Sequence, residues 1–215
     1  MLNIWGRITS INVRKVVWCA QELGLDFQRT EAGGKYGVVQ TPEYRTLNPN
    51  ALVPAIDDGD GDDALHVKLW ESNVIVRYLC AKYSPGNLYP EPLPERFDAE
   101  RWMDWQQTTV NRASAPAFVQ WVRTAPADRN LDVIAPSVHA TERLFAIIDA
   151  HLASRRFMLG ERFTMADIPL GCEAHRWFGL PPSEYTRPAW PNVERWFGEL
   201  KARSGARGVL DLALE

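Results

Sequence analysis

The sequence predicts a small α/β domain followed by an all-helical domain. Strand-like and helix-like segments alternate up to about residue 83, whereas apolar residues beyond residue 94 recur only at helical spacing. Between these regions, "SPGNLYPEPLP" holds four prolines, which is typical of a linker. We therefore expect an α/β domain at residues 1–83, a linker at 84–94 and a helical domain at 95–215.

The first domain is expected to run in the order β-α-β-α-β-β-α. A helix ends at Gly24, and Thr41 followed by Pro42 is typical of the start of another. The expected elements are a strand at 2–5, the helix that ends at Gly24, a strand at 26–32, a short helix from 42, strands at 53–57 and 65–70, and a helix at 72–83.

The second domain carries apolar stripes at helical spacing in four segments and no convincing strand. The expected helical segments are 95–118, 135–153, 164–179 and 191–204. No internal repeat or low-complexity tract interrupts them.

Composition excludes several function classes. The net charge of −3 gives no general attraction to nucleic acid or to an anionic membrane surface. No apolar run approaches the ~20 residues that span a bilayer, and the N-terminus lacks the features of a secretory signal, so we expect a soluble, cytoplasmic protein. Cys19, Cys80 and Cys172 lie far apart in the sequence, and we interpret them as small buried hydrophobic residues in a reducing compartment.

Two motif matches are rejected. Gly59 to Ala64 formally fits a dinucleotide-binding pattern, but a strand follows it where that pattern needs a helix. The same stretch resembles a calcium loop, yet Asp63 and Leu69 stand where that loop needs Gly and Glu. We expect a solvated hairpin turn there. The histidines and cysteines show no metal-ligand spacing, so no metal is expected.

Small polar side chains gather where the first helix begins, at Ser10 and Asn12 in "GRITSINVRKVVW". Helix capping is the commoner role of such residues. A helix N-terminus also stabilises a thiolate, however, and a hydroxyl directed at the sulfur adds a charge-assisted hydrogen bond. Cys19 lies inside the helix and is badly placed to be that thiol. The site is therefore also suited to a thiol that the protein does not supply.

Two further segments allow a ligand as well as a structural role. Pro54 directly precedes a strand, where it is either an ordinary strand-starting proline or part of a cis turn that leaves backbone groups free. Glu71 and Ser72 stand at the start of the third helix, where they serve as caps or receive a carboxylate.

These motifs, in this order and spacing, resemble the cytosolic glutathione transferases over nearly the whole chain, and "SINVRKV" resembles their theta-like and related bacterial members. The resemblance implies a thioredoxin-like first domain, glutathione as co-substrate and a homodimer. It also implies that Ser10 contacts the glutathione sulfur, with Asn12 as an auxiliary donor.

Other residue roles follow from the same resemblance. "LVPAI" implies that Val53, beside a cis Pro54, pairs with the cysteinyl part of glutathione, and "ESNVIVRYL" implies that Glu71 and Ser72 bind the γ-glutamyl end. Some related classes carry a polar side chain where this chain has Ala51 and Leu52. Lys35 and Gln40 are alternative contacts for the glycine end, or solvated loop residues. "GERFTMADIPLG" resembles the family's capping box, with Thr164 at the N-cap and Asp167 three residues later.

The electrophile is expected to lie against the helical domain, because transfer to carbon needs an apolar site opposite the thiolate. Trp105, Thr109 and Arg112 stand at helical spacing and are candidates to line it. The resemblance implies attack of the glutathione thiolate on small hydrophobic electrophiles. The alternatives are a glutathione-dependent disulfide reductase or peroxidase, and a non-catalytic glutathione-transferase-like binding protein.

Overall fold

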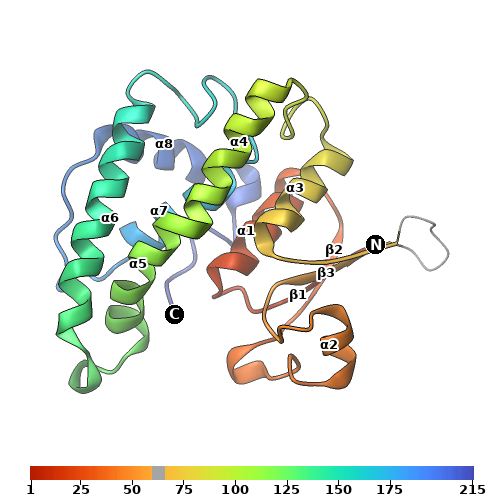
Figure 1. Cartoon of the computed structure of the whole chain (residues 1–215), viewed down its shortest axis with the longest axis horizontal. Helices are drawn as coiled ribbons and strands as arrows, with labels where there is room; N and C mark the ends of the chain where they lie inside the picture. The colour runs from red at the N-terminus through yellow and green to blue at the C-terminus, as the bar shows by residue number, and fades with distance from the viewer. Residues whose placement is uncertain (60–65) are drawn as a thin grey trace.

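The computed structural model describes residues 1–59 and 66–215, and it contains a mixed sheet domain beside a helical domain (Figure 1). The order of elements in the first domain is the predicted β-α-β-α-β-β-α. Apart from Gly59, the hairpin turn expected at 59–64 lies outside the described residues.

A four-stranded sheet in the order β2-β1-β3-β4 forms the centre of the first domain. β1 and β2 are parallel, whereas β1–β3 and β3–β4 are antiparallel. The elements are β1 (Leu2–Trp5), α1 (Ile11–Glu22), β2 (Phe27–Thr30), α2 (Pro42–Leu47), β3 (Ala55–Asp58), β4 (Val67–Trp70) and α3 (Ser72–Tyr83).

Local sequence signals place the ends of these helices. Gly24, just after α1, adopts a φ of 65°, a left-handed conformation that glycine reaches without steric cost. Thr41 caps α2, because its hydroxyl accepts a hydrogen bond from the Tyr44 N–H at 3.2 Å. Pro42 occupies the first position of that helix, where no backbone donor is needed.

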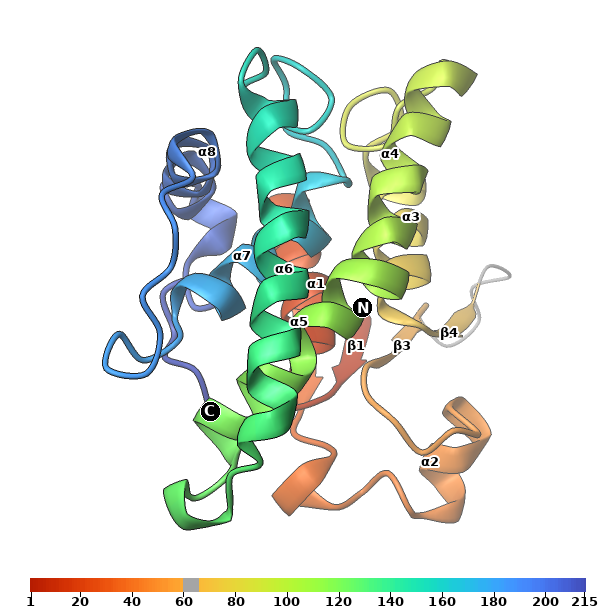
Figure 2. The same cartoon turned by 60° about the vertical axis from the view of Figure 1, so that its left-hand side comes forward.

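The second domain is helical, as predicted, and Figure 2 shows its helices side by side. Its helices are α4 (Leu93–Trp105), α5 (Asn111–Phe118), α6 (Leu131–Leu152), α7 (Asp167–Phe178) and α8 (Pro191–Lys201). α4 begins two residues before the expected domain boundary, because a proline in the first helical turn is tolerated. The segment expected as one helix at 95–118 is a continuous helical run with a π-helical turn at Gln106–Val110, and a second π-helical turn at Val119–Arg123 extends the run beyond it.

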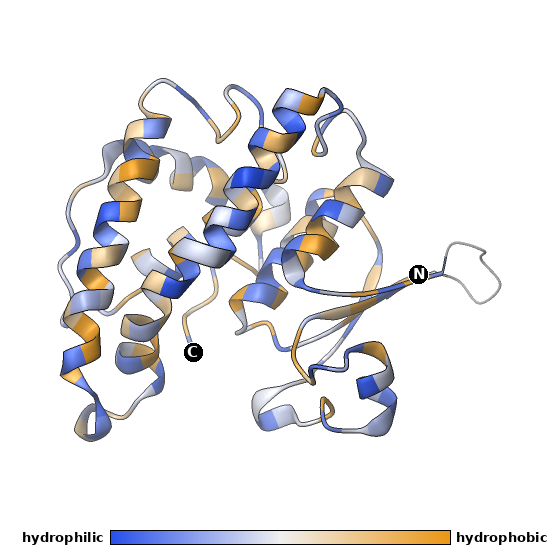
Figure 3. Cartoon of the chain, viewed as in Figure 1, coloured by the Kyte–Doolittle hydropathy of each residue, from blue (hydrophilic) through white to orange (hydrophobic). Residues whose placement is uncertain are grey.

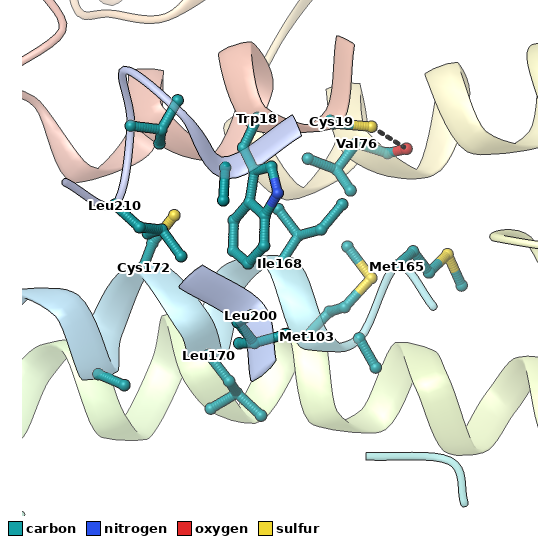
Figure 4. Packing of buried hydrophobic residues seen from close by; sticks show 14 of the residues in the cluster. Trp18, Cys19, Val76, Met103, Met165, Ile168, Leu170, Cys172, Leu200 and Leu210 are labelled. Atoms are coloured by element: carbon teal, nitrogen blue, oxygen red, sulfur yellow. Dashed lines mark hydrogen bonds between the residues drawn. The ribbon is translucent and has the colours of Figure 1, made fainter. Parts of the chain in front are cut away.

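One hydrophobic core runs through both domains. The indole of Trp18 reaches from α1 to α7 (Figure 4), where Gly171 makes room for it. A Cβ at Gly171 would lie 2.7 Å from the Trp18 ring and from Leu200, so this close approach requires glycine. Apolar and polar residues alternate along α4 and α6 (Figure 3), as expected for helices with one face on the core. The continuous core fixes the domains against each other.

The start of α7 forms only part of the expected capping box, because the helix begins at Asp167 with Ala166, not Thr164, at its N-cap. The Thr164 hydroxyl accepts from the Ala166 N–H at 3.4 Å instead. The Asp167 carboxylate accepts hydrogen bonds from the backbone N–H groups of Thr164 and Met158, each at 2.9 Å. Its Oδ1 also accepts one from the Trp196 indole at 2.9 Å. Asp167 is fully buried, so this carboxylate ties the helix start to α8 and to the preceding loop.

All three cysteines are buried and free, which confirms their interpretation as small core residues. The packing of α1 on α3 nevertheless brings together two that are far apart in the sequence, because the sulfur atoms of Cys19 and Cys80 lie 3.5 Å apart. No helix in the described part of the chain is long and apolar enough to span a bilayer.

Candidate functional site

Five of the residues selected from sequence line one pocket of about 140 Å³. Asn12 comes from the first turn of α1, Val53 and Pro54 from the turn before β3, and Glu71 and Ser72 from the start of α3. Sequence analysis did not select the other lining residues, which are Asn48, Asn50, Leu52, Trp70 and Gln107. The fold thus joins three segments that are distant in sequence.

Ser10 occupies the N-cap position of α1, but its side chain makes no capping hydrogen bond. The structural role that such a residue most often has is therefore absent, and the half-buried hydroxyl is left for another partner. Ser10 itself is not part of the pocket lining, whereas Asn12 is. The structure places the amide of Asn12, more directly than the hydroxyl of Ser10, at the mouth of the site.

A short hydrogen-bond chain fixes the orientation of Asn12. The ammonium of Lys15 can only donate, so the Ser72 hydroxyl, 3.5 Å from it, accepts. Ser72 then donates its own hydrogen to Oδ1 of Asn12, at 3.3 Å. The amide nitrogen of Asn12, which has no hydrogen-bond partner among the described residues, remains available to a ligand.

Lys15 is a fully buried cation that links the two domains. Its Nζ donates to Oε1 of Gln106 at 2.8 Å and to Oε1 of Gln107 at 2.9 Å. Both glutamines belong to the π-helical turn that follows α4, a type of turn often found at functional sites. Burial lowers the pKa of Lys15 to about 8, while the negative charge of Glu173 opposes that change.

The polar chain continues into the helical domain through Gln106. Its Nε2 donates to Oε2 of Glu173 at 2.7 Å. The other carboxylate oxygen of Glu173 accepts from Ser114 and from Arg176. Because Glu173 is fully buried, these donors compensate its charge, and the first turn of α1 is held against α7 through paired polar groups.

Glu71 has an unusual backbone and a free side chain. Its φ of 71° lies in a region that L-residues adopt at a cost, and the exposed carboxylate makes no hydrogen bond or ion pair with the described residues. Strain of this kind recurs at ligand sites, where it directs a side chain. The arrangement leaves an anion at the start of α3 that is suited to a ligand ammonium group.

The backbone around Val53 is also free to bind. The Val53–Pro54 peptide bond is cis, and neither the N–H nor the C=O of Val53 is hydrogen-bonded within the described chain. The neighbouring carbonyl, by contrast, is satisfied, because Leu52 accepts from the Tyr44 hydroxyl at 2.6 Å and from the Asn48 amide at 2.9 Å. A peptide-like ligand could therefore pair with Val53.

The three residues selected for the electrophile are not brought into this pocket. Trp105 lines a separate, mainly apolar pocket of about 320 Å³ with Arg101, Trp102 and Ile147. Thr109 is half-buried and Arg112 is exposed, and neither lines either pocket. Their assignment to the electrophile stays a prediction.

Sequence reasoning missed Lys15 and Gln107. Lys15 interrupts the apolar run "VRKVVWCA" in a helix that is buried on most sides, and that anomaly was a usable signal. Gln107 gave none, because a π-helical turn, which the helical pattern does not predict, carries it to Lys15.

Comparisons with known proteins agree with this geometry. A family model described as the glutathione S-transferase N-terminal domain matches residues 9–82, and the corresponding C-terminal model matches residues 132–199. The chain belongs to the glutathione S-transferase family. The family fold, a thioredoxin-like domain with a helical partner, is the one described above.

Individual members of the family are similar over the whole length. Glutathione S-transferase GstB from Escherichia coli K12 is 35% identical, with 98% of each chain covered. A theta-class glutathione S-transferase from Xanthomonas axonopodis pv. citri, whose structure has glutathione bound, is 41% identical with a TM-score of 0.92, and the match covers 100% of this chain and 99% of that one.

Elongation factor 1-gamma 1 from rice is 30% identical over 74% of this chain, but the match covers only 36% of that protein. Sequence similarity to this family thus extends to a protein that is not named as a transferase, and fold alone does not determine the reaction.

Proposed function

We propose that this protein transfers the glutathione thiolate to an electrophilic carbon of small hydrophobic compounds. The observation that carries the proposal is the single pocket formed by Asn12, Val53, Pro54, Glu71 and Ser72. A 41% identical theta-class relative with glutathione bound supports glutathione as the ligand.

The start of α1 supplies the chemistry. Its first N–H groups lack intrahelical partners and carry a partial positive charge, which favours a thiolate over a thiol. The uncapped hydroxyl of Ser10 and the free amide of Asn12 add donors. Lowering the pKa of a thiol from ~8.5 by about two units takes roughly 2.7 kcal/mol. A helix dipole contributes about 0.3–1 kcal/mol and a hydrogen bond to a charged group about 1.5–3 kcal/mol, so these groups suffice.

The rest of the pocket would position glutathione. The γ-glutamyl ammonium would pair with the free carboxylate of Glu71, and the γ-glutamyl carboxylate would approach the N–H groups at the start of α3 beside Ser72. The cysteinyl backbone would pair with Val53, next to Pro54. Two reactants held in this way react with a high effective concentration, and no covalent bond to the protein is needed.

For the electrophile, Trp105, Thr109 and Arg112 remain our candidates, since they belong to the same helical run as Gln107, which lines the glutathione pocket. We also expect a homodimer from family membership. Gel filtration with light scattering measures the mass directly, and a monomer would contradict that expectation.

Two assays test the proposal. Calorimetry of wild type and Ser10→Ala measures glutathione affinity, and turnover of an aryl halide is compared with reduction of hydroxyethyl disulfide. We expect binding and aryl transfer in the wild type. Absence of glutathione binding would leave a non-catalytic protein of the family fold. Binding with disulfide reduction but without transfer would establish the reductase alternative.

A further inference from the structure

A second pocket, of about 230 Å³, opens beside the start of α1 and carries three cations. Arg7 follows β1, Lys35 lies in the short 3-10 helix Gly34–Tyr36 before α2, and Arg123 ends the π-helical turn after α5. The remaining lining residues are Thr9, Tyr36 and Glu215. We call this the cationic pocket. It lies between the two domains, because Arg123 comes from the helical one.

The positive charge of this pocket is poorly compensated. Among residues 1–59 and 66–215, no side-chain carboxylate lies within ion-pair distance of Arg7, Lys35 or Arg123. Within the described chain, Arg123 donates to two main-chain oxygen atoms, those of Glu215 at 3.0 Å and Thr9 at 3.3 Å. Glu215 contributes the one side-chain carboxylate of the lining. Three cations against one side-chain carboxylate leave an excess of positive charge, which favours an anion.

Each cation has a contact with a residue in or beside the pocket. The guanidinium of Arg7 lies on the glycine pair Gly33 and Gly34, since a Cβ on Gly33 would come within 3.0 Å of it. The ammonium of Lys35 lies over the Tyr36 ring, 5.3 Å from its centre. Burial lowers the pKa of Arg123, and the positive charges of Arg7 and Arg176 lower it further. An anion would relieve that repulsion.

The cationic pocket adjoins the glutathione pocket near Ser10, the residue predicted to contact the sulfur. Thr9 lines the cationic pocket and Asn12 lines the glutathione pocket, and Ser10 lies between them in the sequence. Gly33 makes the same connection in space, because a Cβ there would touch both the Arg7 guanidinium and the Val53 side chain, the latter at 3.3 Å. A molecule in the cationic pocket would therefore lie next to the thiolate.

We propose that the cationic pocket binds an anionic group, such as a carboxylate or sulfonate, on the electrophile. This inference rests on the proposed function and specifies its substrate class. In the reaction the glutathione sulfur forms a bond to the electrophilic carbon as the bond from that carbon to a halide breaks. The halide leaves with the electron pair, and the thiol proton has already gone to solvent.

The glycine carboxylate of glutathione is the other source of such an anion. The electrophile is favoured because Arg123, from the helical domain, lines this pocket and bonds to the main chain of Thr9, whereas no arginine of the described chain lines the glutathione pocket. Glutathione affinity separates the two sources. Only binding of the glycine carboxylate predicts that removing a cation weakens glutathione binding.

The test compares 4-(bromomethyl)benzoate with 4-(bromomethyl)benzamide, which differ in charge but little in size. Each kcat/KM is divided by the rate constant of the uncatalysed reaction with glutathione. We expect the wild type to prefer the carboxylate by about tenfold, because three weak ion pairs of exposed groups add up to that scale. The preference should fall as salt is added.

Arg123→Gln and Arg7→Gln should each lower the preference severalfold and leave the KM for glutathione unchanged. Arg143→Gln removes an exposed arginine of α6 that does not line the cationic pocket, so this variant should keep the preference for the carboxylate compound. Equal wild-type use of both compounds, or a raised KM for glutathione in the Arg123 and Arg7 variants, would overturn the inference and leave the proposed function standing. No turnover of either compound would overturn both.

Discussion

Replacing Lys15 by methionine tests the buried cation that supports the site. The pKa of Lys15 falls from 10.5 to about 8 on burial, which at ~1.36 kcal/mol per pH unit corresponds to roughly 3 kcal/mol. At pH 7 that amount opposes folding, and the acceptors on Gln106, Gln107 and Ser72 offset part of it. The methionine variant removes both the desolvation cost of the buried charge and the hydrogen bonds of the ammonium group.

The pH dependence separates these contributions. The folded state releases the Lys15 proton at a lower pH than the unfolded chain, so the unfolded chain binds more protons between about pH 8 and 10.5. Wild-type stability therefore gains from Lys15 as the pH rises through that window, and Lys15→Met lacks this gain. Between pH 7 and 9.5 the wild type should gain about 2 kcal/mol over the variant.

Urea unfolding followed by tryptophan fluorescence measures both proteins at the two pH values, with Lys201→Met, which removes an exposed lysine, as control. The variant should also bind glutathione about tenfold more weakly, because Ser72 is no longer held to orient Asn12. A stability difference that is the same at both pH values would refute the account of Lys15 as a buried charge. Unchanged glutathione affinity would refute its role in orienting Asn12.

Three more outcomes follow from single residues. Glu71→Gly should raise the free energy of unfolding by about 1 kcal/mol, because glycine adopts the φ of 71° without strain, and should still weaken glutathione binding by about tenfold or more. Urea unfolding and calorimetry measure the two effects, and a variant that loses both stability and affinity would contradict this prediction. Asp167→Ala should cost about 3–5 kcal/mol, because three buried N–H groups lose their acceptor, whereas Asp167→Asn, which keeps one oxygen, should cost less, and equal melting temperatures for the two variants would refute that reasoning. Cys19→Ser should destabilise the core and leave glutathione affinity unchanged, and a lost affinity with an intact fold would contradict the structural interpretation of that residue.

The sequence predicted the fold because its local signals agree with one another. Gly24, Thr41 and the linker prolines end or begin elements through their own backbone chemistry, so no tertiary information was needed. The pocket around Asn12 could be predicted only through the order of several motifs, since each motif alone is also an ordinary helix start.

What the sequence did not reveal depends on contacts between the domains. The glutamine partners of Lys15 come from the helical domain that covers it, and Gln107 reaches it only through a π-helical turn. The cationic pocket combines Arg7, Lys35 and Arg123, which are separated by up to half the chain and share no motif. Charges gathered in this way become visible only in three dimensions.

The central claim is that the start of α1 stabilises the thiolate of bound glutathione. Titrating the ultraviolet absorbance of thiolate against pH, with the protein in excess over glutathione, measures the pKa of the bound thiol. We predict a pKa about two units below the free value of ~8.5 in the wild type, and a return towards that value in Ser10→Ala and Asn12→Ala. A bound thiol that titrates like free glutathione in the wild type would contradict the account.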